Sequence, residues 1–188
     1  MRIDIKQAYN SLQECNWGEE DETIILTEQL EYQSNHLHRK LGEKIMAITS
    51  AVCNSFKTEV LKAVHNFTNG ANTFRLALYT SSATLNKSTT VYVTANEVAN
   101  GNGYTTKGAA LTNVTPALSG DTACCDFGNI SFTSASFTTR GCMIYNETVA
   151  NDPAVCVIDF GGNKTVSSGT FTIQFPAADA SNAVVRIA

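Results

Sequence analysis

Charge is scarce over most of this 188-residue chain. Residues 46–188 carry eight Lys/Arg and eight Asp/Glu, whereas residues 1–45 carry five and nine, so the net charge of −4 comes from the first 45 residues. No Lys/Arg stripe with interleaved aromatic residues is present, and such a stripe is the usual mark of a nucleic-acid-binding surface. The composition argues against nucleic acid as a partner.

Long apolar runs are also missing. No run reaches the roughly 18 residues that cross a bilayer, and the opening residues Met1-Arg2-Ile3-Asp4 lack the apolar block of a signal peptide. We therefore expect no membrane partner and synthesis in the cytoplasm.

Histidine is rare, and His65 is the only one after residue 45. A Ser/His/Asp triad would have to depend on this residue, and no Gly-x-Ser-x-Gly elbow accompanies it. We predict no enzymatic activity, no catalytic residue and no cofactor.

The six cysteines show no metal-binding spacing, because Cys-x-x-Cys and His-x-x-x-His pairs are absent. Cys124 and Cys125 are adjacent, and Cys142 and Cys156 lie in apolar runs where a free thiol behaves as a small hydrophobe. We predict free cysteines and no metal; a disulfide staple or metal site is the alternative.

Two Asp-Phe-Gly triplets, at residues 126–128 and 159–161, match a kinase metal motif in isolation. The remaining kinase motifs are missing, so we expect each Asp to close a strand and bond the following turn. A Ca²⁺ site formed by Asp121, Asp126 and Asp159 is an alternative without supporting spacing. Residues 161–165 echo a phosphate loop but lack its first glycine.

Residues 1–45 form a separate extension. Leucine spacing from residue 23 to 41 predicts a helix that Gly42 would end. Gly42-Glu43-Lys44 before Met46 is also what a translated ribosome-binding site would encode. The extension is therefore either a helical arm or an over-called start.

The apolar pattern of residues 46–70 predicts one helix packed on the main domain. Apolar residues from Val52 to Phe67 recur at helical spacing over residues 50–67, with Ser50 as N-cap and Asn69-Gly70 as the stop. His65 would lie on this helix.

Residues 71–188 predict a two-sheet β-sandwich, because short apolar runs alternate with Gly/Asn/Ser/Thr turns. In the run 169–175, Phe171, Ile173 and Phe175 should face the core, with Val155 and Val157 on a partner strand. The expected strands are residues 74–80, 90–94, 111–118, 122–127, 130–133, 136–146, 154–160, 169–175 and 183–187.

Four segments, taken in order, resemble a family of small tailed-bacteriophage virion proteins over residues 46–188. They are Phe74-Arg75-Leu76-Ala77-Leu78-Tyr79; Asn96-Glu97-Val98 running into Gly101-Asn102-Gly103-Tyr104; residues 137–141 with Ile144-Tyr145; and residues 164–176.

The resemblance implies an immunoglobulin-like sandwich in the virion, as a head decoration, a neck or tail component, or a fibre-like knob. Its partners would be other virion proteins and copies of itself, after synthesis in the bacterial host. The family has no catalytic residues; Glu97, Gly101, Gly103 and Tyr104 match its most recognisable loop and should have a structural or contact role. Gly101 and Gly103 should adopt positive φ.

The alternative is a host-surface or carbohydrate-binding module. Tyr79, Tyr92, Tyr104 or Tyr145 would then stack on a glycan. Trp17, the only tryptophan, lies outside the predicted sandwich.

Overall fold

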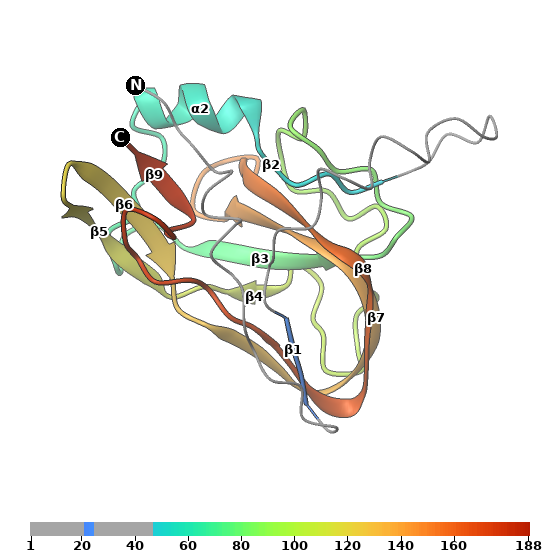
Figure 1. The fold of residues 1–188 in the computed structure, drawn as a ribbon. Coiled ribbons are helices and arrows are strands. Elements are labelled where there is room, and N and C mark those ends of the chain that lie inside the picture. The colour runs from blue at the N-terminus through green and yellow to red at the C-terminus, as the bar shows by residue number, and fades with distance from the viewer. Residues whose placement is uncertain (1–20, 25–46) are drawn as a thin grey trace, which may run out of the picture.

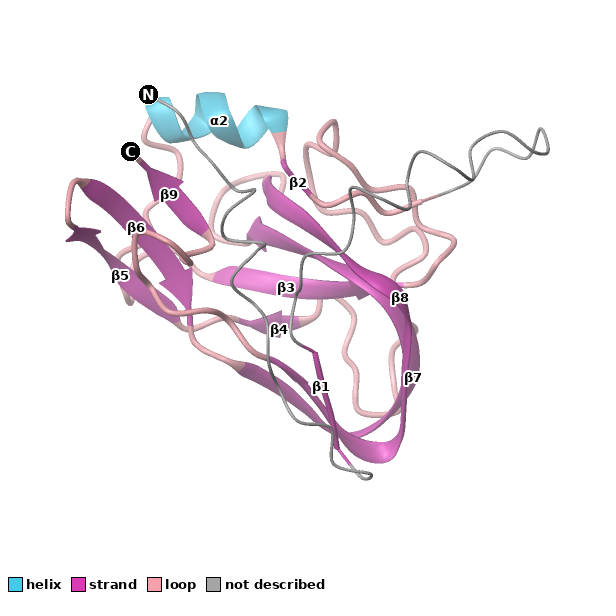
Figure 2. Cartoon of the chain, viewed as in Figure 1, coloured by secondary structure: helices cyan, strands magenta, loops and turns pink. Residues whose placement is uncertain are grey.

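The protein is mainly β, as expected, and forms a β-sandwich of two sheets with one short helix (Figures 1 and 2). The computed structural model describes residues 21–24 and 47–188. The larger sheet has the order β1-β8-β7-β3-β4 with β2 also paired to β8, and the smaller has the order β5-β6-β9. The elements are β1 (Asp21–Ile24), β2 (Ala51–Val52), α2 (Asn54–Leu61), β3 (Phe74–Tyr79), β4 (Ala109–Ala110), β5 (Asn113–Ser119), β6 (Thr122–Phe127), β7 (Ile130–Asn146), β8 (Ala154–Ile173) and β9 (Val185–Ile187).

The strands β7 and β8 form one long curved hairpin along a side of the molecule (Figure 1). The prediction of four short strands over these residues is wrong, because β7 and β8 are continuous. Ser134 and Gly161 have positive φ (51° and 72°), and the ladder shifts register at several points between Phe132 and Tyr145. Residues typical of turns therefore occupy irregularities inside continuous strands, where they bend the hairpin.

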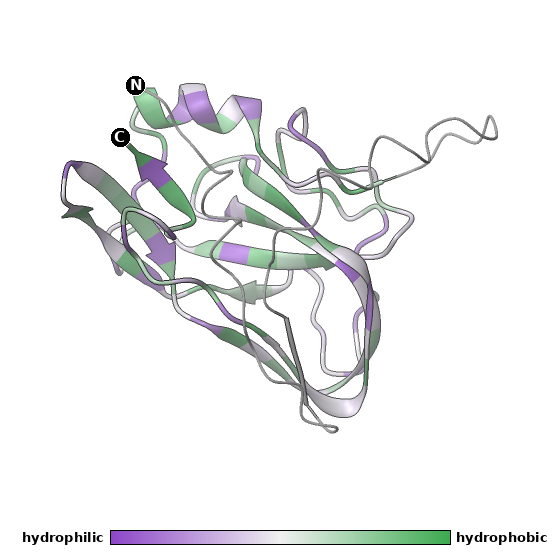
Figure 3. Cartoon of the chain, in the orientation of Figure 1, coloured by the Kyte–Doolittle hydropathy of each residue, from purple (hydrophilic) through white to green (hydrophobic). Residues whose placement is uncertain are grey.

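The core lies between the two sheets and contains the residues predicted from alternation. Phe171, Ile173 and Phe175 are all buried. The Phe127 ring of the smaller sheet lies 5.6 Å from both Phe74 and Phe175, which joins the sheets through aromatic contact. Figure 3 shows hydrophobic colour along β3, β8 and β9.

Val155 and Val157 are buried as expected, but they do not lie on a partner strand of Phe171. They belong to the same strand, β8, whose neighbour along this stretch is β7.

The helix α2 is shorter than the predicted helix over residues 50–67. Residues 51–52 instead form β2, antiparallel to Cys156 and Val157. The Ser50 hydroxyl accepts the N–H of Asp159 at 2.8 Å rather than capping a helix, and Cys53 takes the N-cap position. Residues 51–52 thus pair with the edge of β8 instead of extending the helix.

Residues 90–94 and the segment that starts at residue 23 both differ from their predicted structures. Residues 90–94 contribute only an isolated bridge, Val91 to Pro153. The helix predicted from residue 23 is wrong at its start, because Thr23 and Ile24 belong to β1, which runs parallel to β8. The remainder of that prediction, together with Cys15 and Trp17, lies outside the described residues.

Among the residues that are described, no helix has the length and apolarity to cross a membrane.

The alternation along β8 predicts unequal costs at two adjacent positions. Phe171→Ala should lower the free energy of unfolding by about 3–5 kcal/mol, because it opens a cavity in the core. Thr172→Ala removes a hydroxyl that bonds Ser131 near the surface and should cost at most about 1 kcal/mol. Chemical denaturation of both variants measures the difference; equal losses would contradict the inward direction of Phe171.

Candidate functional site

The loop that carries the resemblance is organised around the carboxylate of Glu97. The Tyr92 hydroxyl donates to Oε2 at 2.5 Å, and the Tyr104 hydroxyl donates to Oε1 at 2.6 Å. The backbone N–H of Lys107 donates to the same Oε1 at 2.8 Å. Glu97 therefore joins three points of one loop through hydrogen bonds to a charged acceptor, which are the stronger kind.

Tyr104 connects this loop to the sheet. Its side chain is buried, and its hydroxyl accepts the N–H of Leu78 on β3 at 3.0 Å while donating to Glu97. Next to it, the N–H of Val98 donates to the Leu78 carbonyl at 2.9 Å. The loop therefore continues the hydrogen bonding of β3 where no regular strand is present.

The two tyrosines that donate to Glu97 are held in their neutral form. Burial raises the pKa of Tyr104 far above its usual value, and its hydrogen bond to Glu97 adds to the shift. The pKa of Tyr92 rises for the same two reasons in the same order. Both hydroxyls therefore stay protonated near neutral pH, where they donate to Glu97 and hold the loop in place.

Both loop glycines have the positive φ that the sequence predicted: +107° at Gly101 and +81° at Gly103. Gly101 and Tyr104 exchange backbone hydrogen bonds of 2.8 and 3.0 Å, which closes a tight turn. A Cβ on Gly103 would lie 2.7 Å from the carbonyl oxygen of Ser134 on β7, whereas a Cβ on Gly101 would meet nothing within 4 Å. Gly103 thus lets the loop rest directly on the long hairpin.

Ion pairs fix the outer side of the same loop. Lys107 Nζ lies 3.2 Å from Asp152 Oδ2 and 3.9 Å from Glu147 Oε1. Arg75 pairs with Glu147 at 3.1 Å, and the Arg75 Nε and the Tyr145 hydroxyl both donate to the Lys107 carbonyl. The sequence did not reveal Tyr92 and Lys107 as partners of Glu97, because no motif joins these three residues.

The tyrosines proposed as sugar-stacking platforms face inward. Tyr79, Tyr104 and Tyr145 are buried. The half-buried Tyr92 stacks on Tyr145 with ring centroids 4.7 Å apart, and Lys107 Nζ lies 5.9 Å from its ring centroid. Their rings are therefore occupied by neighbours of the same fold.

His65 is a buried structural histidine. It lies beyond the end of α2, so the prediction that it lies on the helix is wrong. Its Nε2 is 3.0 Å from Glu59 Oε2, and its Nδ1 lies 3.1 Å from the Asn146 amide nitrogen. Because the Asn146 amide must donate, the network assigns the proton to Nε2. Both ring nitrogens are engaged, so His65 is not placed to activate a nucleophile.

The two Asp-Phe-Gly triplets have different roles. Asp126 closes β6 and accepts the N–H of Phe127 at 2.8 Å, as predicted. The prediction is wrong for Asp159, which lies within β8, pairs with Arg140 at 2.6 Å and accepts the N–H of Gly161. The phosphate-loop echo at residues 161–165 is likewise part of β8.

Among the described residues, no group of three or more His, Cys, Asp or Glu side chains is arranged to hold a metal ion. The described cysteines are free and buried, as predicted: Cys53, Cys124, Cys125, Cys142 and Cys156. Burial raises the pKa of Cys53 to about 12, so this thiol is not reactive near neutral pH.

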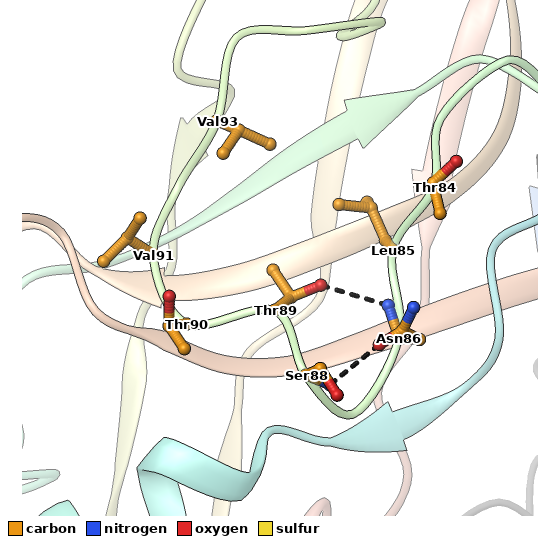
Figure 4. A pocket seen from close by; sticks show the side chains of 8 residues that line it. All are labelled: Thr84, Leu85, Asn86, Ser88, Thr89, Thr90, Val91 and Val93. Atoms are coloured by element: carbon orange, nitrogen blue, oxygen red, sulfur yellow. Dashed lines mark hydrogen bonds between the residues drawn. The ribbon is translucent and has the colours of Figure 1, made fainter.

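A shallow hollow of about 300 Å³ lies along residues 84–93 (Figure 4). Leu85, Val91 and Val93 supply its apolar lining. Two of its polar side chains bond the local backbone: the Asn86 side-chain oxygen accepts the N–H of Ser88, and the Thr89 hydroxyl accepts the N–H of Asn86. The hollow offers no aromatic ring and no charged group for a ligand.

The comparisons with known proteins add no relative: no protein-family model, curated protein or solved structure matches this chain.

The contact between Gly103 and β7 predicts different costs at the two loop glycines. Gly101→Ala should cost about 1–2 kcal/mol from positive φ alone. Gly103→Ala should cost at least about 2 kcal/mol more, because its Cβ would overlap backbone atoms that cannot move aside easily. Urea denaturation of the two variants compares them; similar losses would mean that the loop does not rest on β7.

The Glu97 carboxylate should be more important for stability than the surface carboxylates. Glu97→Gln turns one acceptor oxygen into a donor that faces a hydroxyl or an N–H, and should cost about 1–3 kcal/mol. The matched control Glu147→Gln weakens a pair whose carboxylate side chain is 30% exposed, and should cost about 1 kcal/mol or less. Thermal and chemical unfolding give the two values, and a larger loss at Glu147 would overturn this ranking.

Proposed function

We propose that this chain is a non-enzymatic structural protein of a bacteriophage virion: a capsid decoration, a neck or tail component, or a fibre-associated component. It would act in many copies by packing against itself and other virion proteins. The resemblance of residues 46–188 to small tailed-bacteriophage virion proteins supports this class of protein. One observation supports packing as the mode of action: the polar groups of Glu97, Tyr92 and Tyr104 are all engaged in hydrogen bonds within the fold.

The surface supports packing rather than chemistry. Residues 46–188 carry equal numbers of acidic and basic residues, so copies of this domain would not repel one another through net charge. Leu61 and Leu118 are 72% and 74% exposed. Exposed apolar residues on a weakly charged surface suit contact with other proteins.

An enzymatic role has little support within the described part of the chain. The only described histidine is buried with both nitrogens engaged, and burial raises the pKa of the described cysteine thiols. The inward tyrosines also weaken the glycan-binding alternative, because an aromatic platform must present an open ring face.

Quantitative mass spectrometry of purified particles tests the proposal. We expect many copies of the chain per particle, at a constant ratio to the major capsid protein through successive purification steps. The most N-terminal peptide recovered would also show whether residues 1–45 are translated. Recovery from infected-cell lysate but not from particles would overturn the virion role, and binding of the purified chain to host cells would favour the alternative.

A further inference from the structure

Asp126 is a buried carboxyl group beneath the C-terminal segment. The residue is 1% exposed and lies on β6, whose neighbours are β5 and β9. Its Oδ1 accepts the N–H of Phe127 at 2.8 Å, the backbone N–H of Val184 also approaches the carboxyl group, and none of the described side chains donates to Oδ2. An ionised carboxylate that has no cationic partner and only backbone N–H groups near it is costly to bury, whereas a neutral carboxyl is much less so.

The segment above Asp126 joins the smaller sheet through a short ladder. The strand β9 has three residues and pairs only with Ala123, Cys124 and Cys125 of β6. In this antiparallel register Val184 follows next along the ladder, opposite Asp126. This ladder has few hydrogen bonds to lose, so the closed state depends largely on the burial of Ala183, Val185 and Arg186.

The charged and titratable groups around Asp126 come from three elements. Arg186 of β9 is buried and donates from Nη1 to the Ala180 carbonyl at 2.9 Å. Asp179, in the loop before β9, accepts from Ser181 and Asn182 and raises the pKa of Asp126 through its negative charge. Cys124 lies on β6 itself, and β5 (Asn113–Ser119) contributes no titratable side chain.

The balance of these effects places the titration in the physiological range. Burial raises the pKa of Asp126 from 3.8 to about 7, with the backbone N–H groups of Phe127 and Val184 lowering it and Asp179 raising it. Because the folded pKa lies above the unfolded value, the neutral form is favoured in the closed state. The stabilisation is complete below about pH 4 and is lost as the pH rises towards 7.

We propose that Asp126 is a pH-sensitive latch for the C-terminal segment: its ionisation loosens β9 and the preceding loop and frees the edge of β6. The freed edge presents the backbone of Ala123, Cys124 and Cys125 for pairing with another strand. This latch does not depend on the virion role, because it requires only the contacts within one chain.

Hydrogen exchange of the full chain, read by mass spectrometry at pH 5.5 and 8.0 and corrected for intrinsic exchange, tests the latch. Two-state linkage between the values 3.8 and about 7 gives roughly a 30-fold increase in opening of residues 176–188 over this range. Peptides from β3 and β7 should show no such change. A wild-type segment whose protection is independent of pH would overturn the proposal.

Variants separate Asp126 from other titrating groups. Asp126→Asn should abolish the increase, whereas Asp121→Asn, at an exposed position in the turn between β5 and β6, should retain it. If Asp126→Asn does not fold, Asp126→Ser provides a second neutral side chain at the same place. A full pH-dependent increase in either folded Asp126 variant would show that another group controls the segment.

Discussion

The pairing of β7 with β8 is the constraint on which the rest of the structure depends. Every other strand of the larger sheet either pairs directly with this hairpin or attaches through β3, and its inward side supplies much of the aromatic core. The bend of the hairpin comes from irregularities at Ser134 and Gly161, so the same residues that interrupt its regular ladder also let it curve around the core. A flat hairpin of this length would leave Phe171 and its neighbours uncovered.

The Glu97 cluster is the polar counterpart of this arrangement. A loop without regular strands has backbone groups to satisfy. Glu97 accepts the N–H of Lys107 within the loop, Tyr104 accepts the N–H of Leu78 on β3, and Gly103 allows the loop to touch β7. Buried networks of this kind stabilise a fold only when every member has its partner. Tyr92 and Tyr104 both donate to Glu97, so the cluster stabilises the loop as one connected network.

The sequence predicts the parts of this fold that follow a local period, and fails where a long-range contact decides. Alternation at Phe171 and Ile173 identifies the core face, because each side chain direction follows from its neighbour. Ser50 is a good local signal for a helix cap, and Gly161 for a turn. In the fold, however, the Ser50 hydroxyl accepts the N–H of Asp159 on β8, and Gly161 lies inside β8. Lys107 carries no local signal for its contact with Glu97, since that contact exists only after the loop folds.

The exposed edge of β5 shows what kind of contact the proposed assembly would use. Leu118 and Val114 are exposed there, but Pro116 lacks an N–H and the ladder shifts register between Val114 and Ala117. Both features hinder addition of another strand along this edge. A neighbour at this surface would therefore contact apolar side chains instead of extending the sheet. The β6 edge beneath β9 differs, because its backbone is regular and only the three-residue strand covers it. Within the smaller sheet, strand pairing between copies would thus require the β6 edge to open, while β5 remains a surface for side-chain packing.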